Sequence, residues 1–177
     1  MIIVIMRVHV IAALCKNRGI GFQGKIPWHC RKDMKYFKKM TTGNGKNAVI
    51  MGRKTWDSIQ MPLQNRENIV ITRDSKSLHK NVVTYNSIVN AVHYCRLLGI
   101  DTTWIIGGQQ IYEQATFVKP DAYFLTFLHK DYECDTFMPE VPQGYTLQEC
   151  KYDTYREPND KEDTTMSFTM YSRNHFI

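Results

Sequence analysis

The sequence predicts an α/β fold: one domain with a central, mostly parallel eight-stranded sheet, an antiparallel C-terminal hairpin and about four flanking helices. Over the first two thirds of the chain, runs rich in β-branched residues alternate with segments of helical periodicity. Such alternation is typical of parallel strands that helices bury on both faces. The last two strand-like runs flank the polar segment EPNDKED, which favours an antiparallel hairpin.

Eight strands and four helices account for these patterns. The strands are expected at 8–14, 48–51, 68–72, 82–85, 103–106, 122–128, 146–152 and 164–172. The helices are expected at roughly 31–41, 55–59, 87–98 and 109–115. Asn86 is the expected N-cap of the third helix and Gly99 its stop.

Length and composition favour one globular domain over residues 1–177. The chain has 177 residues, of which 43% are hydrophobic and 23% charged, and no segment reads as a linker. The apolar start MIIVIM is too short for a membrane span, so residues 1–6 are expected to extend the first strand. A net charge of +6 suits an anionic ligand, a nucleic acid or solubility alone, without choosing among them.

The five cysteines indicate a reduced, cytoplasmic protein. Their number is odd, no pair has C-x-x-C spacing, and no histidine lies beside them at ligand spacing. We therefore expect no structural zinc and no other bound metal.

The segment GIGFQGKIPW, residues 19–28, resembles two phosphate-binding loops. Gly19, Gly21 and Gly24 fit G-x-G-x-x-G, and the segment also fits G-x-x-x-x-G-K-[ST] except at its last position, where Ile26 stands. Both loops must lead into a helix, but Pro27 pushes the backbone of Ile26 away from helical angles. The segment is therefore expected to be a flexible loop beside a ligand, or else a plain surface loop.

One acid lies on the apolar face of the first predicted helix. In a helical projection Asp33 falls among Cys30, Met34, Tyr36, Phe37 and Met40, while the basic residues of the helix occupy the opposite arc. A buried carboxylate costs several kcal/mol unless it is paired. Asp33 is thus expected either to face a cationic or amidine-like ligand group with a raised pKa, or to cap the helix.

Two further strand-to-helix junctions carry ligand chemistry. In AVIMGRKTW, helix N-terminal amides, a threonine hydroxyl and two cations follow Gly52, which suits a phosphate. In WIIGGQQIY, the adjacent Gly107 and Gly108 allow a ligand to approach the backbone closely.

These elements together resemble dihydrofolate reductase from about Val8 to the end of the chain. The matching elements, in order, are IAAL, GIG, PW, Asp33 with Phe37, VIMGRKTW, PL with Arg66, NIVITR, IIGGQQIY, LT and DTFMP. The resemblance implies reduction of 7,8-dihydrofolate to 5,6,7,8-tetrahydrofolate by NADPH, with hydride transfer to C6 and protonation of N5. It also implies support of one-carbon metabolism and of thymidylate and purine synthesis.

The resemblance also implies roles at the substrate site. Asp33 would hold the pterin 2-amino group and N3 and promote N5 protonation, with Thr126 supporting the carboxylate and Trp28 ordering a nearby water. Arg66 would pair with the glutamate α-carboxylate. The walls around the substrate would be formed by Ile11, Met34, Phe37, Ile59, Leu63 and Ile106.

The implied cofactor site is made of backbone and cations. Ala13, Ile20 and Gly21 would bind the nicotinamide carboxamide, with residues 22–26 as a mobile flap. The adenosine-phosphate side would comprise Gly52, Arg53, Lys54, Thr55, Thr72 and Arg73, whose cations favour NADPH over NADH. A cis Gly-Gly junction would lie beside the pyrophosphate and nicotinamide, with the neighbouring residues Ile106, Gly107, Gly108, Gln109, Gln110, Ile111 and Tyr112.

Some positions differ from common forms of the family, and other functions remain open. Gln109, Gln110, His29 and Cys30 are less usual, which leaves details of phosphate contact and inhibitor preference open. The alternatives are a reductase of another pterin-like or pyrimidine substrate, a basic nucleic-acid-binding module and a P-loop kinase. The expected partners are dihydrofolate and antifolate-type inhibitors, without a membrane or a required nucleic acid, and the protein is expected to be a monomer.

Overall fold

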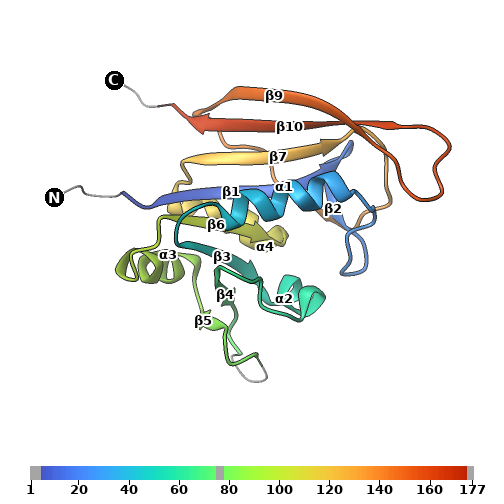
Figure 1. Cartoon of the computed structure of the whole chain (residues 1–177). Coiled ribbons are helices and arrows are strands. Elements are labelled where there is room, and N and C mark those ends of the chain that lie inside the picture. Colours follow the sequence, from blue (N-terminus) through green and yellow to red (C-terminus); the bar gives the residue numbers. More distant parts are fainter. Residues whose placement is uncertain (1–4, 75–77, 175–177) are drawn as a thin grey trace.

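The centre of the molecule is an eight-stranded sheet in the order β5-β4-β3-β6-β1-β7-β10-β9 (Figure 1). The computed structural model describes residues 5–74 and 78–174. The sheet strands are β1 Arg7–Cys15, β3 Asn47–Gly52, β4 Glu67–Ile71, β5 Val83–Tyr85, β6 Thr102–Gly107, β7 Ala122–Leu128, β9 Tyr145–Tyr155 and β10 Thr164–Arg173. The remaining elements are β2 Gly19–Gly21, β8 Thr136–Phe137, α1 Arg31–Thr42, α2 Arg53–Ile59, α3 Ile88–Leu97, α4 Gln109–Gln114 and η1 Ala115–Val118.

The pairing confirms the predicted fold class, a single α/β domain. β1 pairs in parallel with β6 and β7, and β3 pairs in parallel with β4 and β6. β10 runs antiparallel to both β7 and β9, so the last two strands form the expected hairpin. The eight strands predicted from the sequence are the eight strands of this sheet.

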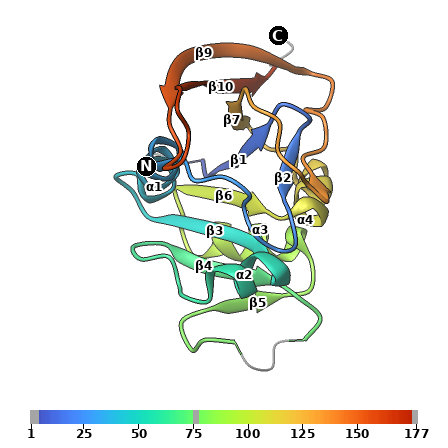
Figure 2. The same ribbon diagram turned by 90° about the vertical axis from the view of Figure 1, so that its right-hand side faces the viewer.

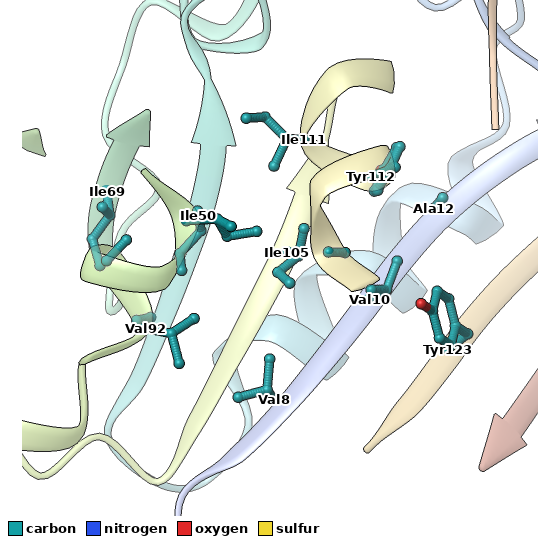
Figure 3. Close-up of a cluster of buried hydrophobic side chains, with 14 of the residues drawn as sticks. Val8, Val10, Ala12, Ile50, Ile69, Val92, Ile105, Ile111, Tyr112 and Tyr123 are labelled. Atoms are coloured by element: carbon teal, nitrogen blue, oxygen red, sulfur yellow. The ribbon is translucent and has the colours of Figure 1, made fainter. Parts of the chain in front are cut away.

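Each face of the sheet carries its own hydrophobic core. On one face, Val10 and Ile105 pack with Ile111 and Tyr112 of α4, and α3 contributes to the same cluster (Figure 3). On the other face, Ile11 and its neighbours pack against α1 and α2. Figure 2 shows α1 and α4 on opposite sides of the sheet. Because side chains alternate along a strand, β1 supplies both cores.

Several local predictions were wrong. The N-cap of α3 is Ser87, whose side chain accepts a hydrogen bond from the Asn90 amide, and not Asn86. α2 begins two residues earlier than expected, directly after Gly52. Ile5 and Met6 precede β1 and do not extend it, while residues 1–4 lie outside the described ranges. The short β2 and β8, which pair in a second sheet, were not predicted.

Candidate functional site

Asp33 is the third residue of α1 and not its cap, because Cys30 is the N-cap residue. The Asp33 side chain is half-buried, and burial raises the pKa of its carboxyl group from 3.8 to about 6. The hydroxyl of Thr126, a buried residue of β7, hydrogen-bonds this carboxyl group and partly offsets that rise. Helix α1 therefore directs the Asp33 carboxyl group toward β7, where the Thr126 hydroxyl interacts with it.

The apolar side chains expected around the substrate gather on the face of the sheet that α1 covers. Members of one cluster are Ile11, Phe37, Ile59, Leu63 and Ile106. Met34 is different, because 60% of its side chain is exposed. The helical projection placed Met34 among the apolar residues of the helix, but solvent reaches that part of α1.

Trp28 precedes α1 and belongs to a different cluster. It is buried with Cys30, Tyr155 and Met166. Its ring packs against Tyr132 with 5.3 Å between ring centroids. The Tyr132 hydroxyl in turn hydrogen-bonds the Tyr155 hydroxyl at 2.7 Å. The indole is thus supported by aromatic side chains from two other segments of the chain.

Arg66 is held beside the C-terminal end of α1. Its Nη1 donates to Thr41 Oγ1 at 2.7 Å, and its Nε donates to the Gln64 carbonyl at 2.9 Å. Burial lowers the pKa of the guanidinium. Within residues 5–74 and 78–174, no acid forms an ion pair with Arg66. Because Arg66 is half-buried and has no acidic partner among these residues, its guanidinium is suited to bind an anionic group of a ligand.

The two glycine junctions lie against each other. The peptide bond between Gly107 and Gly108 is cis, as expected. A Cβ at Gly108 would lie 3.4 Å from Thr55 Oγ1, and a Cβ at Gly52 would lie 3.0 Å from Ile111 Cγ1. The starts of α2 and α4 therefore share one small area, in which the lack of side chains at Gly52 and Gly108 lets Ile111 and Thr55 approach the backbone closely.

The packing around Gly107 connects this area to Asp33. Gly107 has φ +106 and a Cβ there would meet the Tyr112 ring at 2.9 Å, so a side chain is excluded. The buried Tyr112 hydroxyl donates to the Ile11 carbonyl at 2.9 Å. Burial and then the charge of Asp33 raise the pKa of Tyr112. The two candidate halves of the site are thus close enough to interact electrostatically.

The expected phosphate-binding cations are partly engaged within the protein. Arg53 Nε donates to Asp57 Oδ1 at 2.8 Å, and its Nη1 reaches the Asp74 carbonyl at 3.4 Å. Thr72 Oγ1 also bonds the Asp74 carbonyl, at 3.0 Å. Lys54, Arg73 and Gln110 are exposed. These contacts join the start of α2 to the end of β4 and leave two cations facing solvent.

Gln109, at the start of α4, bonds inside the protein. Its Oε1 accepts from the Phe137 amide of β8 at 2.9 Å, and its Nε2 donates to Glu113 at 3.0 Å. Because Phe137 pairs with Gly19, this side chain connects α4 to the segment GIGFQGKIPW, residues 19–28, called the glycine loop below.

The glycine loop enters β2 and then a tight turn, with no helix in it. Phe22 and Lys25 exchange two backbone hydrogen bonds, at 2.8 and 3.0 Å. The two residues between them, Gln23 and Gly24, have φ of 49 and 76. The Gln23 amide donates to Asp135 Oδ2 at 2.7 Å. Ile20 and Gly21 thus lie on β2, and Ala13 lies on β1. The glycine loop does not lead directly into a helix, as both of the phosphate-binding motifs that it resembles would require.

Two residues near the site were missed from the sequence. Tyr36 lies one helical turn after Asp33, and burial, Glu149 and Asp33 together raise its pKa to about 12. The helical projection already placed Tyr36 near Asp33, but no role at the site was assigned to it. Asp135, which holds the turn of the glycine loop, is distant in sequence, and only its place in DTFMP could have suggested it.

The fold and the site define an α/β enzyme with a half-buried acid and two glycine-containing strand-to-helix junctions. The chain belongs to the dihydrofolate reductase family, because the family model "Dihydrofolate reductase" matches residues 7–173. It is therefore an oxidoreductase, and the reaction of its family reduces dihydrofolate to tetrahydrofolate with a nicotinamide cofactor.

Relatives from several organisms agree with this assignment. The chain is 40% identical over 149 residues to dihydrofolate reductase of Heliothis virescens, which covers 77% of this chain and 80% of the relative. It is 35% identical over 185 residues to the Candida albicans enzyme, covering 93% and 95%. It is 36% identical over 179 residues to bifunctional dihydrofolate reductase-thymidylate synthase of Glycine max, covering 93% of this chain and 33% of that protein.

The described residues were compared with the requirements of a membrane-spanning helix and of a metal-binding cluster. In these ranges, no helix is long and apolar enough to cross a membrane. No group of three or more histidine, cysteine, aspartate or glutamate side chains within 5–74 and 78–174 could hold a metal ion.

Proposed function

We propose that the protein catalyses NADPH-dependent reduction of 7,8-dihydrofolate to 5,6,7,8-tetrahydrofolate. NADPH supplies a hydride that adds to C6 of the pterin, while N5 of the same C=N bond takes up a proton, leaving NADP⁺ and the saturated bond. The observation that carries the proposal is Asp33, a half-buried acid with a raised pKa beside the hydroxyl of Thr126.

Asp33 would bind and orient the pterin. Its two carboxylate oxygens can accept hydrogen bonds from the 2-amino group and from N3–H, which fixes the ring in one plane. Thr126 would keep the carboxylate in that plane, since it already hydrogen-bonds the group. Trp28 would order the water through which a proton reaches N5. Binding also offsets the energetic cost of burying the acid.

Apolar residues and one cation would hold the rest of the substrate. The cluster that contains Phe37, Ile59 and Leu63 offers apolar surface for the ring and benzoyl group. Arg66 would pair with the α-carboxylate of the glutamate, and its bond to Thr41 fixes the direction of the guanidinium. A reductase of a substrate without a carboxylate tail would give Arg66 no ligand.

The glycine junctions fit a dinucleotide. The half-buried Gly52 and Gly108, at the starts of α2 and α4, would allow its pyrophosphate to approach the backbone, whereas Gly107 lies buried against Tyr112. Lys54 and Arg73 would supply the counter-charge for a 2′-phosphate, which supports NADPH over NADH. Ala13, Ile20 and Gly21 would bind the carboxamide and so place the hydride donor against the pterin.

The experiment is the loss of NADPH absorbance with dihydrofolate as the second substrate. We expect turnover with NADPH and a much higher KM with NADH. Correctly folded protein that oxidises no NADPH with dihydrofolate would refute the proposal. Equal kcat/KM values for NADPH and NADH would refute the assigned role of the cations.

A further inference from the structure

Two cysteines that are far apart in the sequence meet where β1 ends. Cys15 is the last residue of β1, and Cys134 lies in the segment between β7 and β8. Their Sγ atoms are 3.7 Å apart, although 119 positions separate the residues. Cys15 is fully buried and Cys134 is half-buried, so solvent reaches the pair from the Cys134 side.

The two cysteines also contact the residues at which the glycine loop begins. Cys15 Sγ donates to Asn17 Oδ1 at 2.9 Å, and that oxygen also accepts from the Gly19 amide at 3.1 Å. A Cβ at Gly19 would lie 2.3 Å from Cys134 Sγ, so the thiol rests directly on the backbone of β2. A change at either sulfur is therefore transmitted to Gly19 and to the residues that follow it.

The other three cysteines lack this arrangement. Cys30 and Cys95 are buried, and the Sγ of Cys30 contacts the Sδ of Met166 at 3.8 Å. Cys150 is exposed on β9. Among the described residues, the 15–134 pair is the one place where two thiols contact each other.

We propose that Cys15 and Cys134 form an oxidative modification site, at which a low-molecular-weight disulfide such as oxidised glutathione converts the two thiols into an intramolecular disulfide. The Cys134 thiolate attacks one glutathione sulfur, which forms a mixed disulfide and releases one glutathione thiolate. Cys15, after losing its proton, then attacks Cys134 Sγ and releases the second glutathione. The protein thus loses two protons and two electrons, and one oxidised glutathione becomes two reduced molecules.

The surroundings of Cys134 make the reaction slow at neutral pH. Burial and the contact with Cys15 raise the pKa of Cys134 to about 11, and the charge of Asp135 acts in the same direction. Because the thiolate is the nucleophile, the oxidation rate should rise nearly tenfold per pH unit between about pH 7 and pH 9.

Closing the disulfide must disturb the loop. A disulfide bond is about 2.05 Å long, so sulfurs that now lie 3.7 Å apart must approach each other considerably. Cys15 also loses the proton that it donates to Asn17. Both changes act at Gly19, and we expect them to restrain residues 20–25 and slow turnover; this consequence rests on the proposed function of that loop.

The site is tested on the full chain with oxidised glutathione at pH 8.5. After denaturation and alkylation, the wild type should carry three alkylated cysteines out of five, with peptides containing Cys15 and Cys134 joined. Cys150→Ser, the exposed control, should form the same link. Cys134→Ser should form none. Because Cys134 is only half-buried, this variant should keep its fold, which far-UV circular dichroism checks.

Two results would overturn the site: five alkylated cysteines in the treated wild type, or a glutathione adduct that persists on Cys134. Turnover of the oxidised wild type should fall by roughly threefold or more and recover with dithiothreitol. A linked protein with undiminished turnover would overturn the effect on the loop. The turnover of the reduced protein is measured in parallel. If the protein did not reduce dihydrofolate at all, the reduced sample would show no turnover, whereas the alkylation result would still decide whether the disulfide forms.

Discussion

Replacing Asp33 by asparagine should stabilise the protein at neutral pH. Burial raises the folded-state pKa of Asp33 from 3.8 to about 6, so the folded protein holds this proton more tightly than the unfolded chain does. The associated stability is present below pH 3.8 and is lost as the pH rises through 6. At 1.36 kcal/mol per unit, the wild type therefore forfeits about 3 kcal/mol at pH 7. An asparagine side chain has no charge to desolvate, so the variant avoids this loss.

The pH dependence distinguishes this cause from a general packing effect. Linkage predicts that the variant's advantage in unfolding free energy is smaller at pH 5, where the loss caused by Asp33 is about 1.5 kcal/mol. Urea unfolding followed by tryptophan fluorescence at both pH values measures it. His9, whose pKa burial lowers to about 4, affects both proteins alike, so the difference between them isolates Asp33.

An exposed acid provides the control. The side chain of Asp131 is 72% exposed, and Asp131→Asn should change the unfolding free energy by less than about 0.5 kcal/mol at either pH. If Asp33→Asn gave an equal change at pH 5 and pH 7, or destabilised the protein more at pH 7, the reasoning about desolvation would be refuted.

Three other substitutions, two of them with a matched control variant, test the remaining parts of the site. Arg66→Leu should raise the KM for dihydrofolate by roughly tenfold or more with little change in kcat. The control Arg96→Leu, in the last turn of α3, should change neither constant. A loss confined to kcat would argue against a carboxylate as the partner of Arg66. Lys54→Met should raise the KM for NADPH several-fold but leave the KM for NADH unchanged, since NADH lacks the 2′-phosphate. Gly24 and Gly144 have φ of +76 and +91, and no atom lies within 4 Å of the position that a Cβ would take at either residue. Gly24→Val and Gly144→Val should therefore each cost about 1–2 kcal/mol of stability through backbone strain. Only Gly24→Val should also slow turnover. Equal turnover in these two variants would contradict the role of the loop.

The sheet was predictable because runs rich in β-branched or apolar residues mark its strands. Every strand that the sequence predicted lies in the eight-stranded sheet, and the polar turn before β10 set the hairpin. β2 and β8 have three and two residues, and β2 reads GIG, whereas the equally short β5 lies in the β-branched run VVTY. β2 and β8 form because the fold brings Gly19 and Phe137 together as a strand pair, and a contact between residues so far apart in the chain cannot be read from local sequence.

The site was predictable where one helix determines it. The position of Asp33 among apolar residues follows from helical periodicity, and its burial and raised pKa agree with that expectation. The exposure of Met34 could not be predicted, since it depends on which elements cover α1. The bond from Arg66 to Thr41 and the meeting of Cys15 with Cys134 arise from tertiary packing across 25 and 119 positions.

The most direct test of the central claim is the turnover of Asp33→Asn with dihydrofolate and NADPH at pH 7. Where urea unfolding shows the variant to be at least as stable as the wild type, a loss of activity cannot come from unfolding. We predict a fall in kcat/KM of roughly a hundredfold or more. Turnover equal to that of the wild type, in a variant that remains folded, would contradict the claim that Asp33 binds the pterin and promotes its protonation.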